Sequence, residues 1–152
     1  MSGEDTTGES TDAEADAGAY RLQDQIGFIL RKAHQRHVAI FAAHIGDLTP
    51  PQFAALARLR DVGETSQNQL GALVAMDAAT IKGVIDRLKA RGLVTLTRHA
   101  GDRRRLMVDL TPQGRAAVER LVPLAERITA ETLAPLSARE AATLTRLLAR
   151  IA

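Results

Sequence analysis

Three consecutive arginines, Arg103, Arg104 and Arg105, stand in the stretch GDRRRLMVDLT, which then runs into alternating apolar positions. Guanidinium groups at the tip of a two-stranded ribbon have no core to join, whereas a narrow DNA minor groove of negative potential attracts them. Asp102 and Arg104 are two residues apart, so in an extended segment they project to the same side and are expected to pair. We therefore predict a DNA-contacting loop; a solvated charge run is the alternative interpretation.

A second group of polar residues lies upstream, at the starts of two short predicted helices that follow the N-caps Ser66 and Asp77. Two short helices separated by so few residues are typical of a helix-turn-helix, whose second helix enters the major groove. A helix pair that only packs is the alternative. If the motif binds DNA, the residues expected at phosphates and base edges are Ser66, Gln67, Asn68, Ala78, Ala79, Thr80 and Lys82.

Aromatic and histidine side chains gather in the first 53 residues, which hold all four aromatic residues and three of the four histidines. His37 and His44 interrupt an apolar helical stripe, and Arg31 and His34 border it. An apolar pocket with a few converging polar groups is the general form of a small-molecule site, and an arginine fork suits a carboxylate. We predict a site for an aromatic or heteroaromatic carboxylate effector formed by Tyr20, Phe28, Arg31, His34, His37, Phe41, His44 and Phe53.

Two other interpretations of the histidines stay open. They can be ordinary contacts between subunits, or His34, His37 and His44 can be metal ligands, since two imidazoles three residues apart share one helix face. The chain has no cysteine and no obvious acidic fourth ligand, so we predict neither a metal nor a cofactor.

The elements that position these residues follow from apolar spacing and cap signals. Spacings of three and four residues predict a long helix over residues 20–45 and a second, after the Thr49 cap and Pro50, to about residue 62. Period-two alternation predicts a β-hairpin over residues 94–110. Thr111 then caps a helix that Pro123 can kink, and a Ser137 capping box opens the last helix. The fold expected is mainly α (α+β): a winged helix-turn-helix of six helices with a two-stranded β-hairpin wing.

Composition narrows the class of protein. The first twenty residues hold six acidic residues and no basic one, which leaves 20 basic against 12 acidic residues, or +8, for the remainder. Residues 1–18 are expected to be a disordered acidic tail. The sequence lacks a signal peptide, a long apolar span, a nucleophile elbow and a phosphate-binding loop, so we expect a cytoplasmic protein without membrane contact that is not an enzyme.

Residues 70–114, LGALVAMDAATIKGVIDRLKARGLVTLTRHAGDRRRLMVDLTPQG, resemble the core signature of the MarR family of winged-helix transcriptional regulators. The matching positions are Leu70, Asp77, Thr80, Asp86, Arg87, Leu88, Gly92, Leu93, Val94, Arg98, Asp102, Arg103, Arg104, Val108, Leu110, Thr111 and Gly114. The resemblance adds Arg87 and Asp102 to the DNA-binding set. Gly83 departs from the family, because a polar base-reading side chain is common there.

The resemblance implies a homodimeric repressor on a pseudo-palindromic, double-stranded operator, with an effector pocket between the first helix, the second helix and the helix after the wing. The first helix, IGFILRKAHQRHVAIF, is similar to that of regulators of aromatic-acid catabolism, including nicotinate degradation. The regions expected are a tail (1–18), a dimerisation helix (19–48), the DNA-binding region (49–114) and C-terminal dimerisation helices (115–152), in one folding unit. A metal-responsive regulator and a protein-interaction module that never binds DNA are the alternatives.

Overall fold

The computed structural model describes residues 18–152, and the chain divides into two parts, one ending at His34 and the other running from Gln35 to Ala152. The predicted disordered tail therefore lies outside the described residues, except for Gly18.

The first part holds a short 3-10 helix, η1 (Leu22–Asp24), and the opening turns of α1 (Ile26–His44). The prediction of one helix from residue 20 is wrong here, because Gln25 has an extended backbone between η1 and α1. The Gln25 side-chain amide donates to the carbonyl of Arg21 at 3.0 Å, and such local side-chain bonds compete with helix formation. The predicted end of the helix is correct to within one residue.

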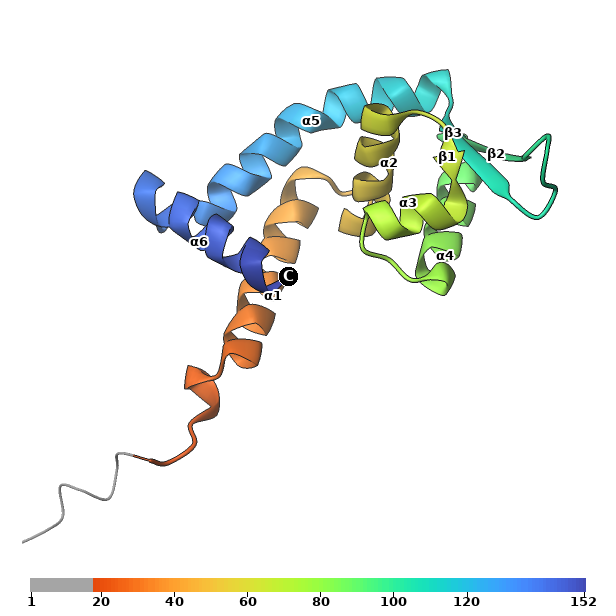
Figure 1. Ribbon diagram of the computed structural model, residues 1–152. Coiled ribbons are helices and arrows are strands. Elements are labelled where there is room, and N and C mark those ends of the chain that lie inside the picture. The colour runs from red at the N-terminus through yellow and green to blue at the C-terminus, as the bar shows by residue number, and fades with distance from the viewer. Residues whose placement is uncertain (1–17) are drawn as a thin grey trace, which may run out of the picture. The chain divides into compact units, whose positions relative to one another are not determined.

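The second part contains the rest of α1 and five further helices, so the described residues hold the six α-helices that were predicted (Figure 1). At each new helix the side chain of the predicted cap residue accepts the backbone N–H three residues on, which confirms Thr49, Ser66, Asp77, Thr111 and Ser137 as N-caps. The helices are α2 (Pro50–Val62), α3 (Gln67–Leu73), α4 (Ala78–Ala90), α5 (Pro112–Leu133) and α6 (Ala138–Ile151). Helix α5 continues through Pro123.

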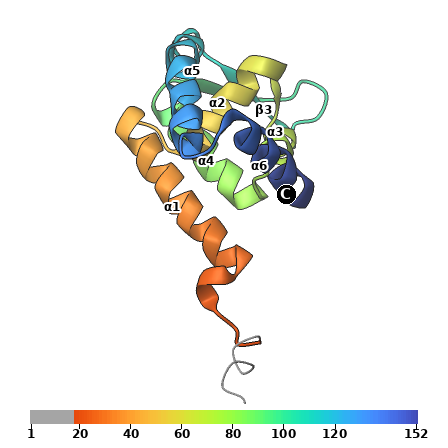
Figure 2. The same ribbon diagram turned by 90° about the vertical axis from the view of Figure 1, so that its left-hand side faces the viewer.

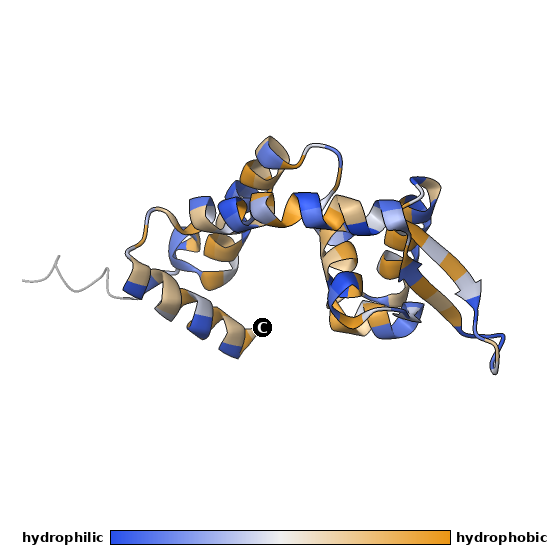
Figure 3. Ribbon diagram, turned by 90° about the horizontal axis from the view of Figure 1, so that it is seen from above, coloured by the Kyte–Doolittle hydropathy of each residue, from blue (hydrophilic) through white to orange (hydrophobic). Residues whose placement is uncertain are grey.

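The wing belongs to a three-stranded antiparallel sheet in the order β1-β3-β2. Strands β2 (Val94–Arg98) and β3 (Leu106–Leu110) form the predicted hairpin, in a register that pairs Arg98 with Leu106. Hydrophobic and hydrophilic positions alternate along most of β2, β3 is hydrophobic except at Asp109, and the loop that joins the two strands is mostly hydrophilic (Figure 3). The third strand, β1 (Thr65–Ser66), is missing from the prediction because two residues are too short to show a period.

The core joins α2, α3, α4, the sheet and α5. Its largest fully buried side chains are Ile45, Leu56, Leu59, Leu70, Ile81, Ile85, Leu88, Val108 and Val118. Burying each such side chain stabilises the fold by roughly 1.5–3 kcal/mol. Helix α6 contributes no buried residue, and α5 spans the distance between the sheet and α6 (Figure 1). In Figure 2 α6 and the adjoining end of α5 face the viewer.

Helix α5 starts in close contact with the end of α4. Gly92, at φ +72°, ends α4 in the left-handed conformation that glycine favours at this position, and its carbonyl accepts the Thr111 hydroxyl at 2.6 Å. The Thr111 N–H donates to Leu93 O at 3.1 Å, and Gly114 packs directly against that carbonyl. The helix after the wing is thereby fixed to the loop that precedes the wing. Along the described chain, none of the helices combines the length and hydrophobicity that crossing a bilayer requires.

Candidate nucleic-acid interface and effector cavity

Helix α4 presents its N-terminal half to solvent. Its buried face consists of Ile81, Val84, Ile85 and Leu88, so the predicted base-contacting residues Ala78, Ala79, Thr80 and Lys82 are all exposed. Asp77 accepts the Thr80 backbone N–H at 2.7 Å, and this hydrogen bond lowers the pKa of the Asp77 carboxyl below its ordinary value. The cap sets where the helix begins and therefore which residues face outward.

Two basic residues of α4 are available to an anionic partner. Lys82 forms an ion pair with Asp86 one turn on, at 2.8 Å, which was not foreseen. Both side chains are more than half exposed, and exposed pairs of this kind contribute only about 0.3–0.5 kcal/mol, so Lys82 can leave Asp86 at little cost. Arg87 is also exposed.

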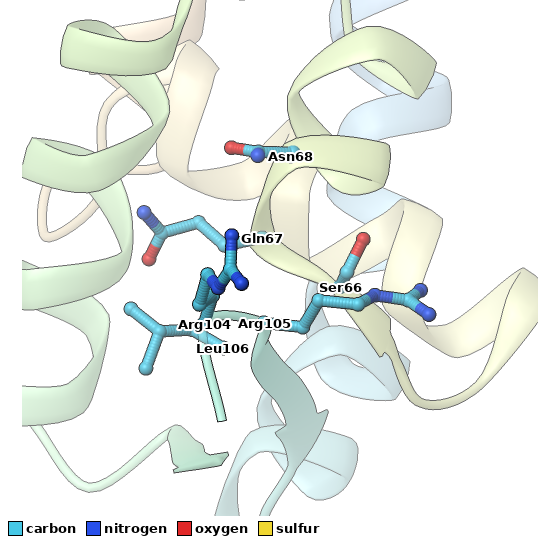
Figure 4. A pocket seen from close by; sticks show the side chains of 6 residues that line it. All are labelled: Ser66, Gln67, Asn68, Arg104, Arg105 and Leu106. Carbon is cyan, nitrogen blue, oxygen red and sulfur yellow. The ribbon is translucent and has the colours of Figure 1, made fainter. Parts of the chain in front are cut away.

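The start of α3 and the wing line one cavity of about 320 Å³ (Figure 4). Ser66, Gln67 and Asn68 come from α3 and its cap, and Arg104, Arg105 and Leu106 come from the wing. In Figure 4 the Arg104 side chain points toward Gln67, whereas the Arg105 side chain runs past Ser66 in another direction. Gln67 Oε1 is buried and lacks a hydrogen-bond partner within residues 18–152. The polar residues predicted at the start of α3 and those predicted in the wing thus line the same cavity, although Gln67 and Arg104 are 37 residues apart in sequence.

Asp102 holds the wing turn by accepting hydrogen bonds from backbone N–H groups and not by the predicted ion pair with Arg104. Asp102 Oδ1 accepts the backbone N–H of Arg104 at 3.0 Å, and Asp102 O accepts that of Arg105, also at 3.0 Å. The prediction assumed an extended segment, but the chain turns here, and a short aspartate reaches the backbone two residues on. The side chains of Arg103, Arg104 and Arg105 are exposed as a result.

A second cavity, of about 180 Å³, lies between α1, α2 and α5, the three helices between which the effector pocket was predicted. Phe41 and Phe53 have ring centroids 6.3 Å apart. Three of the eight predicted effector residues line this cavity: His37, Phe41 and Phe53. The sequence prediction missed the other four lining residues, which are Pro50, Ala125, Ile128 and Thr129. Ala125 and Ile128 could have been found, because they belong to the apolar stripe of α5.

Polar contacts tie the second half of α1 to the end of α5. His37 Nδ1 lies 2.9 Å from the Thr132 hydroxyl, and Arg36 donates to the carbonyls of Thr132 and Glu131 at 2.6 and 3.0 Å. His44 Nε2 lies 2.6 Å from Glu131 Oε2, and His44 does not line the cavity. Arg36 and His44 therefore fix the two helices that border the cavity.

The remaining predicted effector residues, Tyr20, Phe28, Arg31 and His34, lie in the part of the chain that ends at His34. Tyr20, Arg31 and His34 are exposed, and Phe28 is half-buried with the Lys32 ammonium 5.7 Å from its ring centroid. Residues 18–152 contain no group of three metal-ligating side chains, and His37 and His44 have the separate partners given above.

The sequence of this chain is similar to those of known transcriptional regulators. The profile of a family described as the MarR family matches residues 46–105. The HTH-type transcriptional repressor NicR of Pseudomonas putida is 44% identical over 130 residues, which make up 84% of this chain and 82% of NicR.

Two solved structures share the fold over most of the chain. A probable transcriptional regulator from Pseudomonas aeruginosa is 56% identical with a TM-score of 0.84, and the match covers 87% of this chain and all of that one. BpsR of Bordetella bronchiseptica, whose DNA binding is regulated by 6-hydroxynicotinic acid, is 45% identical with a TM-score of 0.84, covering 88% of this chain and 97% of BpsR.

Proposed function

Because the chain belongs to the MarR family of winged-helix transcriptional regulators, we propose that it is a homodimeric repressor that releases its operator when a single-ring aromatic or heteroaromatic carboxylate binds. It is a DNA-binding regulator and not an enzyme. We place its action in the cytoplasm, where the operator DNA is.

The observation that carries DNA binding is the joint exposure of the α4 start and the wing arginines. Ala78, Ala79, Thr80 and Lys82 have no role in the core, and an α-helix fits the major groove. In the proposed complex Arg103 enters the minor groove, whose negative potential favours a guanidinium. The cavity between α3 and the wing takes a backbone phosphate, because two arginines and two side-chain amides line it.

The dimer is supported by apolar side chains that are exposed within the described residues 18–152 of one copy of the chain. Helix α6 exposes Leu144, Leu147 and Ile151 and buries no residue at all. In the other part of the chain, Ile26 and Ile29 are exposed as well. A second copy related by two-fold symmetry covers such surfaces and sets the half-sites about one helical turn, roughly 34 Å, apart.

The effector class follows from the size and lining of the cavity between α1, α2 and α5. An apolar cavity of about 150 Å³ is known to hold one benzene molecule, so 180 Å³ admits one ring with small substituents. Two aromatic rings flank the space, and His37 and Thr129 supply polar groups for a carboxylate or ring nitrogen. BpsR, regulated by 6-hydroxynicotinic acid, makes hydroxylated pyridine carboxylates the first compounds to test.

Operator binding is tested by fluorescence anisotropy with the full chain and DNA from its own promoter region over a series of salt concentrations. We expect affinity to fall steeply with salt, because each neutralised phosphate releases counterions. If the protein does not bind this DNA, or if its affinity does not change with salt concentration, the result would support a protein-interaction module instead.

Effector binding is tested by calorimetric titration with 6-hydroxynicotinate, nicotinate and benzoate. Thr129→Val keeps the side-chain shape but removes the hydroxyl from the cavity, and should weaken the best acid about tenfold. The matched control is Thr145→Val on α6, where the hydroxyl only bonds the Ala141 carbonyl, and its affinity should equal the wild type. Equal heats for Thr129→Val and the wild type, or heat from zinc alone, would contradict the proposed site.

A further inference from the structure

The loop between β2 and β3 folds around the imidazole of His99, the first residue after β2. His99 Nδ1 lies 3.0 Å from the backbone nitrogen of Gly101 and 3.0 Å from that of Asp102. Both backbone N–H groups donate to this one atom, so the ring nitrogen carries the lone pair and the proton of the neutral imidazole is on Nε2. His99 is half-buried, although the loop around it is exposed.

The geometry resembles an Asx turn made by a histidine. Asn and Asp commonly shape turns because their Oδ1, one bond from Cγ, accepts a backbone N–H two residues on. The Nδ1 atom of histidine is also bonded to Cγ, and so reaches the same donors. Asparagine at position 99 is therefore the side chain that best reproduces this acceptor without the ring.

The hydrogen bonds to His99 Nδ1 continue, through Asp102, into hydrogen bonds with the backbone of Arg104 and Arg105. Asp102, fixed at its N–H by His99, accepts the Arg104 N–H through Oδ1 and the Arg105 N–H through its carbonyl. Arg98 Nη1 donates to Arg103 O at 2.8 Å, so the Arg98 side chain stabilises the loop. Every residue from 101 to 105 thus has a backbone group bonded within the loop or to β2.

Gly101 completes the fit. A Cβ atom there would lie 3.3 Å from His99 Cε1 and 3.5 Å from Nδ1, which is tighter than an ordinary contact for the first of these. The absence of a side chain at residue 101 lets the imidazole approach its two donors.

We infer that His99 is a positioning residue of the wing, which preorganises Arg103, Arg104 and Arg105 for DNA through the acceptor at Nδ1. The inference rests on the proposed function. A loop that is already ordered pays less conformational entropy when it binds, so removing the acceptor weakens binding without removing any DNA-contacting group.

Three variants at one position separate the acceptor from the ring. His99→Phe keeps a ring but has no acceptor, His99→Ala removes both, and His99→Asn restores an acceptor at the same bond distance from Cα. Loss of two backbone hydrogen bonds in an exposed loop should weaken operator binding about 5- to 30-fold in the Phe and Ala variants. The Asn variant should stay within about threefold of the wild type.

A second measurement detects the hydrogen bonds of the Gly101 and Asp102 amides to His99 in the free protein, without DNA. Water-exchange NMR of the free protein at slightly alkaline pH should show faster exchange of the Gly101 and Asp102 amides in His99→Phe, and near-wild-type exchange in His99→Asn. Wild-type operator affinity in His99→Phe, equal weakness of Phe and Asn, or unchanged amide exchange in His99→Phe would each overturn the inference. If the wild type binds no operator, the proposed function fails, and the exchange rates still decide whether His99 holds the turn.

Discussion

Replacing Gly114 by alanine should destabilise the protein, because the added methyl group has no space. An ideal Cβ at residue 114 would lie 1.9 Å from Leu93 O, 2.9 Å from Leu93 C and 3.3 Å from Leu110 Cδ2. Ordinary contact begins at 3.4 Å, and two of the three atoms belong to the backbone, which cannot move aside by changing a rotamer. The start of α5 must therefore shift away from Leu93 by more than an ångström.

The cost can be estimated from the contacts that such a shift disturbs. Overpacking in a close-packed region costs about 1–3 kcal/mol. Separation of α5 from Leu93 also weakens the 3.1 Å bond from Thr111 N to Leu93 O, which adds about 1 kcal/mol. The better helix propensity of alanine returns about 0.5–1 kcal/mol. The net loss is about 1–3.5 kcal/mol, or roughly 2–14 °C in melting temperature for a chain of this size.

The assay is thermal unfolding followed by circular dichroism at one fixed protein concentration, since dimer formation makes the melting temperature depend on concentration. Gly83→Ala is the matched control: it lies inside α4, its Cβ meets nothing within 4 Å, and it should gain about 0.5–1 kcal/mol. A Gly114→Ala variant that melts at or above the wild-type temperature would refute the reasoning.

Three further changes test the DNA surface, the dimer and the acid response. Arg103→Ala should weaken operator binding and lower its salt dependence by about one ion without changing the melting temperature, because this side chain is exposed; equal affinity would mean that the wing remains in solvent. Leu147→Glu places a charge on the exposed apolar face of α6 and should shift sedimentation toward the monomer; an unchanged dimer would move the interface elsewhere. The Thr80 N–H lowers the pKa of Asp77, so Asp77 stabilises the fold above its ordinary pKa and loses that effect as pH falls through its lower folded pKa. Urea unfolding of Asp77→Asn at several acidic pH values should therefore show a smaller loss of stability than the wild type, and identical acid profiles would contradict this.

Local signals made most of the fold predictable. Thr49, Ser66, Asp77, Thr111 and Ser137 each precede a helix and bond within three residues, so the sequence itself contains both partners. Strands β2 and β3 are long enough to show alternation, whereas β1 is defined only by its partner on β3, over forty residues away.

The candidate sites were predictable as residue types more than as contacts. The wing arginines stand out by charge, but the Asp102–Arg104 pair was wrong because side-chain direction depends on a turn that the alternation could not show. A cavity does lie between the three helices where the effector pocket was predicted, yet the contacts of His37 and Arg36 with Thr132 join residues 95 and 96 positions apart. No periodic pattern encodes such a distance.

Strand β3 lies in the middle of its sheet, and this position limits the movements by which the protein can release DNA. Because β3 is paired with β2 on one side and with Thr65 and Ser66 on the other, the wing cannot swing independently of the helix that Ser66 caps. In the proposed dimer we therefore expect the wing, α3 and α4 to move together when the spacing between the two half-sites changes. We expect the hinge for that movement outside residues 65–110, and substitutions that loosen it should alter the response to effector while leaving the affinity of each half-site unchanged.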